Sequence, residues 1–398
     1  MHRHALLSLI LSGLLLYGGL FPFHGWTSGD AIAFLAEKQP VRSAYEDVFV
    51  NILVFIPLGI ASTLALTLNA RYRIARSVSL AIAHGFFLSF AIEAFQAFLP
   101  MRNSSAVDLL TNTLGTGIGS LLAVALRARA NRLHAREHEW FEHSPATRLA
   151  LTSFAVWALS QIVPLNPVID VFTLRARWAA LWRWPSATDP WSLGGLVAFA
   201  LAVAGLGLLL KAVLRDSHRT HAWHFLALVI PVMARLVMGE HGLKFDALMG
   251  AAVGAMIACS FPPISRRNYG TLAALAIGAS FILSEVLPGT GGAYRAFNWI
   301  PFKAHLQNPV VGVGALLEGM WIAIALVASR YVAKGGAEWR DVWVVSITSM
   351  VGAGALEVFQ TRLPGRYPDV TIPLVMGAAC LLSFLSSGVG RPRRRDAL

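Results

Sequence analysis

The side chains best suited to chemistry lie at the end of an apolar stretch. Glu93 and Gln96 are three residues apart, so they share one face of a helix, and Arg102 follows in a turn that contains Leu99-Pro100. At a rise of about 1.5 Å per residue, Glu93 lies on the order of 9 Å inside that turn. A charged side chain in an apolar span carries a high desolvation cost, so Glu93 is expected to have a structural or functional role. The neighbouring guanidinium could hold a carboxylate or a phosphate.

The stretch after the turn carries further polar groups. Asp108 and Asn112 are four apart and share a helix face. Gly115 and Gly119 form a small-x-x-x-small pair that lets a second backbone approach closely. These glycines therefore predict a structural role.

Two interpretations of this cluster stay open. In the first, its side chains form one hydrogen-bonded network that pins a helical hairpin, with Asp108 favoured by the dipole at a helix N-terminus. In the second, the cluster is a binding site at the outer leaflet, where Arg102 takes an anionic headgroup and Glu93 exchanges a proton or bonds a sugar. No nucleophile–base pair or metal-ligand set is evident, so we predict no catalytic residue, metal or cofactor.

The same pattern recurs near the end of the chain, where both copies read E-x-F-Q-x-x-L-P-x-R. The second copy supplies Glu357, Gln360 and Arg366, and Asp369 follows it as Asp108 follows the first. Matches at unchanged spacing indicate an internal duplication. These four residues are therefore candidate ligand-binding residues as well.

The first copy resembles the VanZ-like membrane proteins, whose signature pairs an N-x-x-x-F-x-P-x-G helix with a later E-x-x-Q…R…D-x-x-x-N-x-x-G block. The matching residues are Asn51, Phe55, Pro57 and Gly59, then Glu93, Gln96, Arg102, Asp108, Asn112 and Gly115. In the last copy, Pro373 and Met376 stand where Asn and Gly are expected. The resemblance implies structural roles for Asn51 and Pro57 and an association with reduced sensitivity to teicoplanin-type glycopeptides.

The composition is that of a membrane protein. Of 398 residues, 56% are hydrophobic and 14% charged, and the mean hydropathy is +0.59. Cys259 and Cys380 lie in apolar runs, which argues against a disulfide framework. The net charge of +12 comes from loops between apolar runs, so it indicates topology and not a nucleic-acid partner.

Apolar runs of the length that crosses a bilayer predict an all-α polytopic bundle of about twelve spans in three four-helix repeats. The predicted spans are Ala5–Phe21, Val48–Leu68, Ser77–Leu99, Ala106–Leu126, Arg148–Pro164, Ser192–Leu214, His221–Met238, Lys244–Ser260, Thr271–Leu287, Val311–Tyr331, Asp341–Thr361 and Val370–Ser387.

These spans predict a division of the chain into repeats. A first VanZ-like group (1–127), a cytoplasmic linker (128–147), a degenerate second group (148–262), a third group (263–390) and a basic tail (391–398) follow one another. In the second group Arg235 lies roughly where the others have Glu, and Asp246 opens the last helix.

Most of the 33 Lys and Arg residues lie in the even-numbered loops and at the two ends. Basic loops stay in the cytoplasm. We therefore expect a multi-pass protein of the bacterial inner membrane, with both termini cytoplasmic and each L-P-x-R turn outside.

Three functions fit this topology. The first is a non-enzymatic cell-envelope protein that binds or shields an anionic glycolipid or polyprenyl-phosphate intermediate at the outer leaflet, with membrane lipids as its other partners. The second is a transporter or flippase of such a lipid that titrates Glu93 and Glu357. The third is a membrane-embedded transferase or hydrolase with Glu93 as general base.

The orientation can be tested with single cysteines. Labelling from outside should reach positions Arg102, Arg295 and Arg366, and labelling from the cytoplasm should reach Arg73 and Arg136, because basic loops are retained inside. Cytoplasmic labelling at Arg102 would reverse the topology.

Overall fold

The protein is described by a computed structural model that is helical throughout its ordered elements. The structure describes residues 3–21, 23, 26–35, 45–67, 73–100, 102–142, 144–163, 170–181, 192–215, 221–238, 243–287, 292–307 and 309–387. The chain forms two compact units, which we call the N-terminal unit (Met1–Arg136) and the C-terminal unit (Glu137–Leu398).

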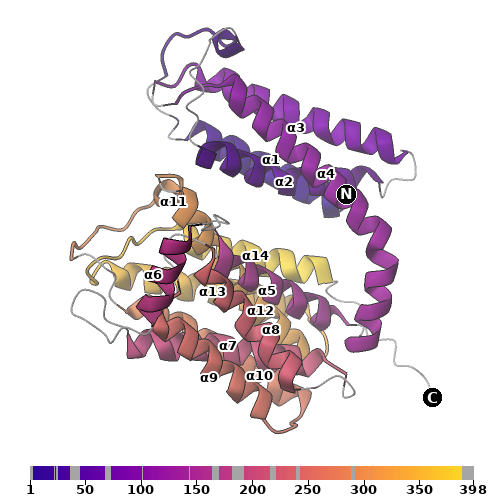
Figure 1. The fold of residues 1–398 in the computed structure, drawn as a ribbon, viewed down its shortest axis with the longest axis vertical. Coiled ribbons are helices and arrows are strands. Elements are labelled where there is room, and N and C mark those ends of the chain that lie inside the picture. The colour runs from indigo at the N-terminus through magenta and orange to yellow at the C-terminus, as the bar shows by residue number, and fades with distance from the viewer. Residues whose placement is uncertain are drawn as a thin grey trace. The chain divides into compact units, whose positions relative to one another are not determined.

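The N-terminal unit is a small bundle of four long helices, drawn from indigo to magenta in Figure 1. Its elements are α1 (Arg3–Leu20), η1 (Ala33–Leu35), α2 (Tyr45–Thr67), α3 (Ile74–Gln96) and the first part of α4 (Ala106–Trp140). A small apolar core of Phe55, Leu58 and Ile92 holds α2 against α3. Many large apolar side chains point outward instead, as expected where lipid replaces water as the solvent.

Glycine brings α2 and α4 into backbone contact. A Cβ on Gly115 would lie 2.2 Å from the Ile52 carbonyl oxygen, and one on Gly119 would lie 2.1 Å from that of Ile56. Gly59 meets the Thr116 carbonyl oxygen in the same way, at 2.1 Å. Gly115 and Gly119 therefore lie where the α2 and α4 backbones approach closely, and their structural role stays a prediction.

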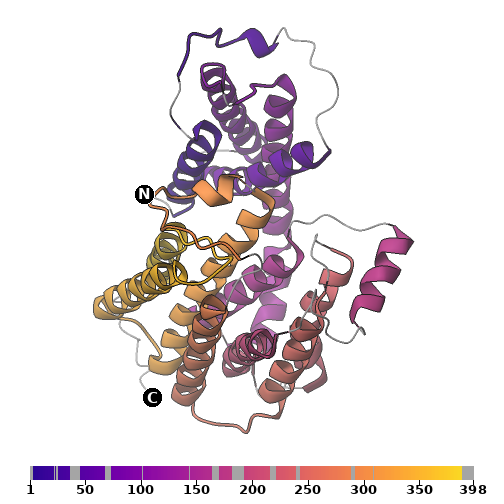
Figure 2. The same ribbon diagram turned by 90° about the vertical axis from the view of Figure 1, so that its left-hand side faces the viewer.

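The C-terminal unit is a larger bundle built around a central helix. Its elements are α5 (Pro145–Ile162), α6 (Val171–Leu181), α7 (Leu193–Val213), α8 (His221–Met233), η3 (Ala234–Leu236), α9 (Phe245–Ser260), α10 (Arg266–Val286), α11 (Lys303–Gln307), α12 (Pro309–Lys334), α13 (Trp339–Gln360) and α14 (Thr371–Ser387). Nearly every residue of α7 beyond Ala198 is buried, between α5, α9, α10 and α12. The orange-to-yellow helices α12, α13 and α14 pack side by side (Figure 2).

Short polar side chains start many of these helices. Ser144, Ser192 and Ser265 accept hydrogen bonds from backbone N–H groups in the first turns of α5, α7 and α10. These N–H groups have no partner inside the helix. A cap therefore removes the free-energy cost of an unsatisfied hydrogen-bond donor, which is high in lipid. The predicted span start at Ser192 is a cap, whereas those near Arg148 and Thr271 lie more than one helical turn after the caps Ser144 and Ser265.

The all-helical fold class is confirmed. Seven helices in the described part of the chain are long and apolar enough to cross a membrane: Val48–Thr67, Ile74–Gln96, Ala106–Arg127, Leu193–Val213, Arg266–Val286, Gly312–Lys334 and Trp339–Gln360. Shorter apolar helices cover four further predicted spans, and α5 covers the remaining one. The number of about twelve spans stays a prediction.

The region predicted as a linker, 128–147, is largely helical, because α4 continues without a break to Trp140. The predicted second and third groups lie within one compact unit. Their division into two repeats stays a prediction, and the basic tail, 391–398, lies outside the described residues.

The helix crossing predicts a sharp difference between neighbouring glycines. Gly115→Ala should destabilise the protein by about 1–3 kcal/mol, because the new methyl group overlaps the α2 backbone. Gly117→Ala is the matched control, since its Cβ would meet only Ile82 Cδ1, at 3.9 Å. Thermal melting in detergent measures both, and equal melting temperatures would contradict the crossing.

Candidate functional site

The N-terminal motif (Glu93–Arg102) closes the hairpin between α3 and α4. Glu93 is only 2% exposed, and its Oε2 accepts a hydrogen bond from the backbone N–H of Ser105 at 2.8 Å. The Ser105 hydroxyl in turn accepts from the N–H of Val107 at 3.1 Å, at the start of α4. Glu93 therefore fixes the residue that caps the next helix.

The arginine and glutamine of this motif hold the end of α1. Arg102 Nε donates to the Phe21 carbonyl at 2.9 Å, and Nη2 donates to that of Gly18 at 3.1 Å. Gln96 Nε2 donates to the Gly19 carbonyl at 2.8 Å. Carbonyls in the last turn of a helix lack partners within it and carry the negative end of its dipole. Burial lowers the pKa of Arg102, yet a guanidinium stays charged in proteins, so Arg102 is a cationic cap.

The remaining polar residues of this copy tie α4 to its neighbours. Asn51 Nδ2 on α2 donates to Asp108 Oδ1 at 2.9 Å, and Asn112 Nδ2 donates to the Ser89 hydroxyl on α3 at 3.0 Å. Pro57 lies inside α2. The structure thus brings the predicted residues of this copy together in a hydrogen-bonded network; their ligand-binding role stays a prediction.

The C-terminal motif (Glu357–Arg366) makes the same contacts. Glu357 Oε2 accepts from the backbone N–H of Asp369 at 3.0 Å, twelve residues onward, as Glu93 accepts from Ser105 twelve residues onward. Arg366 donates to the carbonyl of Ser284 in the last turn of α10 and to that of Leu287, the residue just after it. Gln360 donates to the Glu285 carbonyl at 3.4 Å. Both copies of the motif therefore close a hairpin and cap the end of an earlier helix, α1 or α10.

These contacts correct one part of the sequence alignment. Asp369 occupies the place of Ser105, not that of Asp108. The backbone N–H of each residue donates a hydrogen bond to the glutamate of its motif, and the side chain of each caps the next helix. Asp369 Oδ1 accepts from the N–H of Thr371 at 2.8 Å. At the same spacing Met376, not Pro373, stands opposite Asn112. The sequence pattern misled because both residues are polar and both precede an apolar run.

The C-terminal copy differs from the N-terminal one in its additional charges. Glu285 on α10 lies 3.8 Å from Arg366 and accepts a hydrogen bond from Gln360. Glu318 on α12 interacts electrostatically with Glu285, Arg235 and Arg366. Arg235, the irregular residue of the predicted second group, thus faces an acid of the third.

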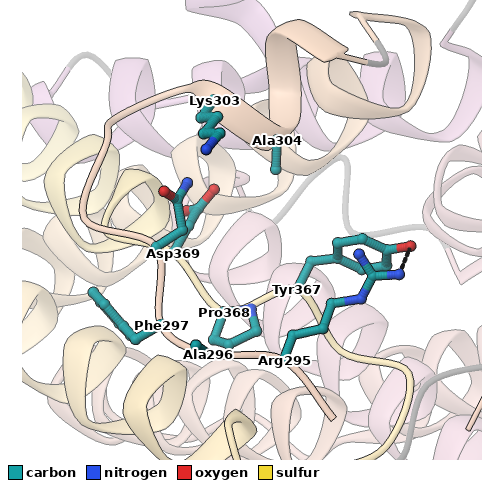
Figure 3. A pocket seen from close by; sticks show the side chains of 9 residues that line it. Arg295, Ala296, Phe297, Lys303, Ala304, Tyr367, Pro368 and Asp369 are labelled. Carbon is teal, nitrogen blue, oxygen red and sulfur yellow. Dashed lines mark hydrogen bonds between the residues drawn. The ribbon is translucent and has the colours of Figure 1, made fainter. Parts of the chain in front are cut away.

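A pocket of about 430 Å³ opens beside the C-terminal motif. Its lining residues are Arg295, Ala296, Phe297, Asn298, Lys303, Ala304, Tyr367, Pro368 and Asp369. Lys303 and Asp369 extend toward each other from opposite sides of it, and Arg295 packs on Tyr367 at one end (Figure 3). The Arg295 guanidinium carbon lies 3.5 Å from the centre of that ring. The loop before α11 and the turn after α13 together supply the pocket.

Most residues that line this pocket are not among the candidate site residues in the sequence. Asp369 is the one lining residue that is also a candidate. The available signal was composition. The segment from Tyr294 to Lys303 carries two basic residues and several aromatic ones between two apolar runs. Backbone pairing of Asn298 with Pro368 and Val370 brings that segment to the C-terminal motif.

The cap interpretation predicts equal roles for the two motif arginines. Arg102→Ala and Arg366→Ala should each destabilise the protein by about 1.5–3 kcal/mol, because charge-assisted bonds to helix-end carbonyls are lost. Arg73→Ala is the control, since Arg73 is exposed and makes no capping hydrogen bond through its side chain. Melting in detergent measures all three, and an Arg102 variant as stable as the Arg73 variant would refute the cap.

Comparison with known proteins agrees with the geometry of the N-terminal unit. The family model described as VanZ/LLP1 matches residues 11–127, which include the second part of α1, all of α2 and α3, the N-terminal motif and the first part of α4. No solved structure matches the chain. Residues 11–127 are thus similar to the VanZ/LLP1 family, and the N-terminal unit contains a VanZ-like domain.

Proposed function

We propose that the pocket of the C-terminal unit binds the anionic headgroup of a cell-envelope lipid, a glycolipid or a polyprenyl phosphate, at the outer leaflet. The observation that carries the proposal is the pair of cations, Arg295 and Lys303, in one pocket at the loop ends of apolar helices. Guanidinium and ammonium groups are the usual protein ligands of phosphate.

Arg295 is prepared for such a role before any ligand arrives. Its guanidinium lies over the Tyr367 ring and donates to the Tyr367 hydroxyl. Both contacts restrict the rotamers of a long side chain, so less conformational entropy is lost when an anion binds. Cation–π stacking leaves further N–H groups of the guanidinium free to face the pocket.

Exposed aromatic residues surround the pocket. Tyr294, Trp299 and Tyr367 are 68%, 74% and 58% exposed, which is unusual for such large side chains. Tyr and Trp concentrate at the boundary between hydrocarbon and headgroups, because each has an apolar body and a polar tip. This supports a pocket mouth at headgroup level, where a lipid reaches it without leaving the bilayer.

The side chains of the N-terminal motif are less suited to binding a lipid headgroup. The carboxylate of Glu93 and the guanidinium of Arg102 are engaged with backbone groups of their own unit. Arg366 is engaged in the same way. We assign to both motifs the task of building the bundle, and to the loop before α11 the task of binding.

A second candidate function is lipid transport. It is favoured by Glu318, an acid within the apolar helix α12 that interacts electrostatically with Arg235, Arg366 and Glu285. In membrane transporters, ionisable side chains often lie at the interface between structural repeats, where substrate binds. Binding and transport differ in whether lipid crosses the bilayer, so a scrambling assay on reconstituted protein distinguishes them.

The proposed function predicts charge-dependent lipid binding. The double variant Arg295→Ala, Lys303→Ala should lose at least about tenfold in affinity for nanodiscs of anionic lipid, because both cations that face the phosphate are gone. Arg362→Ala removes an exposed cation from the same turn region and should bind as wild type does. Binding that is equal for all three proteins, measured by thermophoresis, would reject the pocket as the site.

A further inference from the structure

We propose that α6 is an interfacial helix, which lies in the plane of an anionic leaflet with Phe172 and Trp178 among the acyl chains and Arg175 at the phosphates. The partner is the lipid surface itself, so this contact goes beyond the binding of one headgroup in the pocket. Such a contact depends neither on the pocket nor on its ligand.

α6 is a separate helix that is too short to cross a bilayer. It contains 11 residues, whereas a span needs about 20. Asp170 caps its start: Oδ1 accepts from the N–H of Phe172 at 3.2 Å, and Oδ2 accepts from that of Thr173 at 2.8 Å. The chain therefore starts a new helix in the connection between α5 and α7, and α6 extends neither of them.

One face of α6 is fixed to the C-terminal unit. Leu181 is 1% exposed, and Arg177 Nη1 donates to the carbonyl of Leu236, the last residue of η3, at 3.4 Å. Leu174 is partly buried and shares this face, at the spacing i, i+3, i+7 with Arg177 and Leu181. α6 is therefore held against the bundle along one side, and the rest of its surface is open.

Beside that face α6 exposes large apolar side chains. Val171, Phe172 and Trp178 are 66%, 81% and 49% exposed. Arg175 lies among them at helical spacing and is exposed too. The remaining face carries only short side chains, which are Thr173, Ala176 and Ala180. Apolar groups with one arginine between them suit the boundary of a bilayer, where Phe and Trp enter the acyl region and Arg reaches the phosphates.

α6 lies at the end of the bundle that carries the C-terminal motif. Arg235 of η3 interacts electrostatically with Asp246, which accepts from the N–H of Ser192 at 3.5 Å, at the start of α7. A Cβ on Gly194, in the first turn of α7, would lie 2.7 Å from Leu287, just after α10. Because α7 is long and apolar enough to cross a membrane, its start marks the level of a headgroup region.

α6 also runs in the direction that an interfacial helix needs. In Figure 1 it lies across the direction of α7, α9 and α10, and it stays upright in Figure 2. A helix that crosses a spanning helix steeply lies along the bilayer surface. Its apolar face then enters the leaflet by about 5–10 Å, as in other amphipathic helices that bind membranes.

The charge of α6 indicates an anionic leaflet. None of its 11 residues is acidic, and two are arginines. Asp170, just before the helix, is occupied as its cap. Arg177 faces η3, so Arg175 is the cation on the outward side. An anionic headgroup meets only attraction there.

Neighbouring alanines provide a matched test. Ala179 is seven residues after Phe172 and shares its face, whereas Ala180 lies on the face of short side chains. Ala179→Cys and Ala180→Cys are each labelled with a fluorophore on the full-length protein, in nanodiscs that hold one copy. Cys259 and Cys380 are buried, and unsubstituted protein controls for their labelling.

A nitroxide near the top of the acyl chain should quench the label at position 179, and aqueous iodide should quench the one at position 180. Each label should resist the other quencher, because one faces lipid and the other faces water. Iodide quenching at both positions, or lipid quenching at both, would overturn the interfacial helix. So would shielding of position 179 only when two copies share a nanodisc, since a second copy would then be the occupant.

The charge is tested with the same label at position 179. Nitroxide lipids with a phosphatidylglycerol headgroup should quench it more strongly than those with phosphatidylcholine. Arg175→Ala should reduce that enrichment by as much as about fivefold, the effect of about 1 kcal/mol for one cation near an anionic surface. Equal quenching by the two lipids in unsubstituted α6 would overturn the anionic assignment.

The pocket variant Arg295→Ala, Lys303→Ala separates this contact from the proposed function. Quenching at position 179 should be the same in this variant, because neither side chain belongs to α6. Loss of that quenching would tie α6 to the pocket and overturn its independent role. Quenching that persists while headgroup binding is absent from every protein would reject the proposed function and leave the interfacial helix intact.

Discussion

The structure depends on how helix ends are satisfied where water is scarce. Each helix leaves its last carbonyls without internal partners, and hydrocarbon offers none. Arg102 and Gln96 supply donors to the end of α1, and Arg366 and Gln360 do so for α10. In each copy the donors come from the end of the second long helix further along the chain, α3 or α13, and from the turn after it. One short motif therefore fixes three helices at once.

The motif acid completes this arrangement. By accepting an N–H twelve residues onward, Glu93 and Glu357 each set the position of the residue that caps the next helix. Acid, glutamine and arginine thus act as a unit, which explains why all three recur at fixed spacing. Once the helix ends are fixed, the second cap position is free to vary: Ser105 serves only as a cap, and Asp369 also reaches a pocket.

The C-terminal copy of the motif differs from the N-terminal one in the extra charges that surround it, which is why we propose the binding site there. Among the described residues, Glu285, Glu318 and Arg235 have no charged counterpart in the hydrogen bonds of the N-terminal unit. Polar groups inside a membrane bundle are costly, so their accumulation in one place marks a task beyond packing. The VanZ-like domain supplies the structural pattern, and the C-terminal unit uses it to hold a pocket.

The sequence by itself determined the helical class, the apolar spans and the motif, because periodic apolar runs and repeated polar residues are local properties. It also indicated the tight crossing at Gly115 and Gly119. Only the tertiary structure decided what the polar residues do. Arg102 finds its carbonyls some eighty residues back in the chain, and Arg295 stacks on Tyr367, which lies 72 residues onward. Such partners are set by packing between distant segments, which spacing along one sequence does not encode.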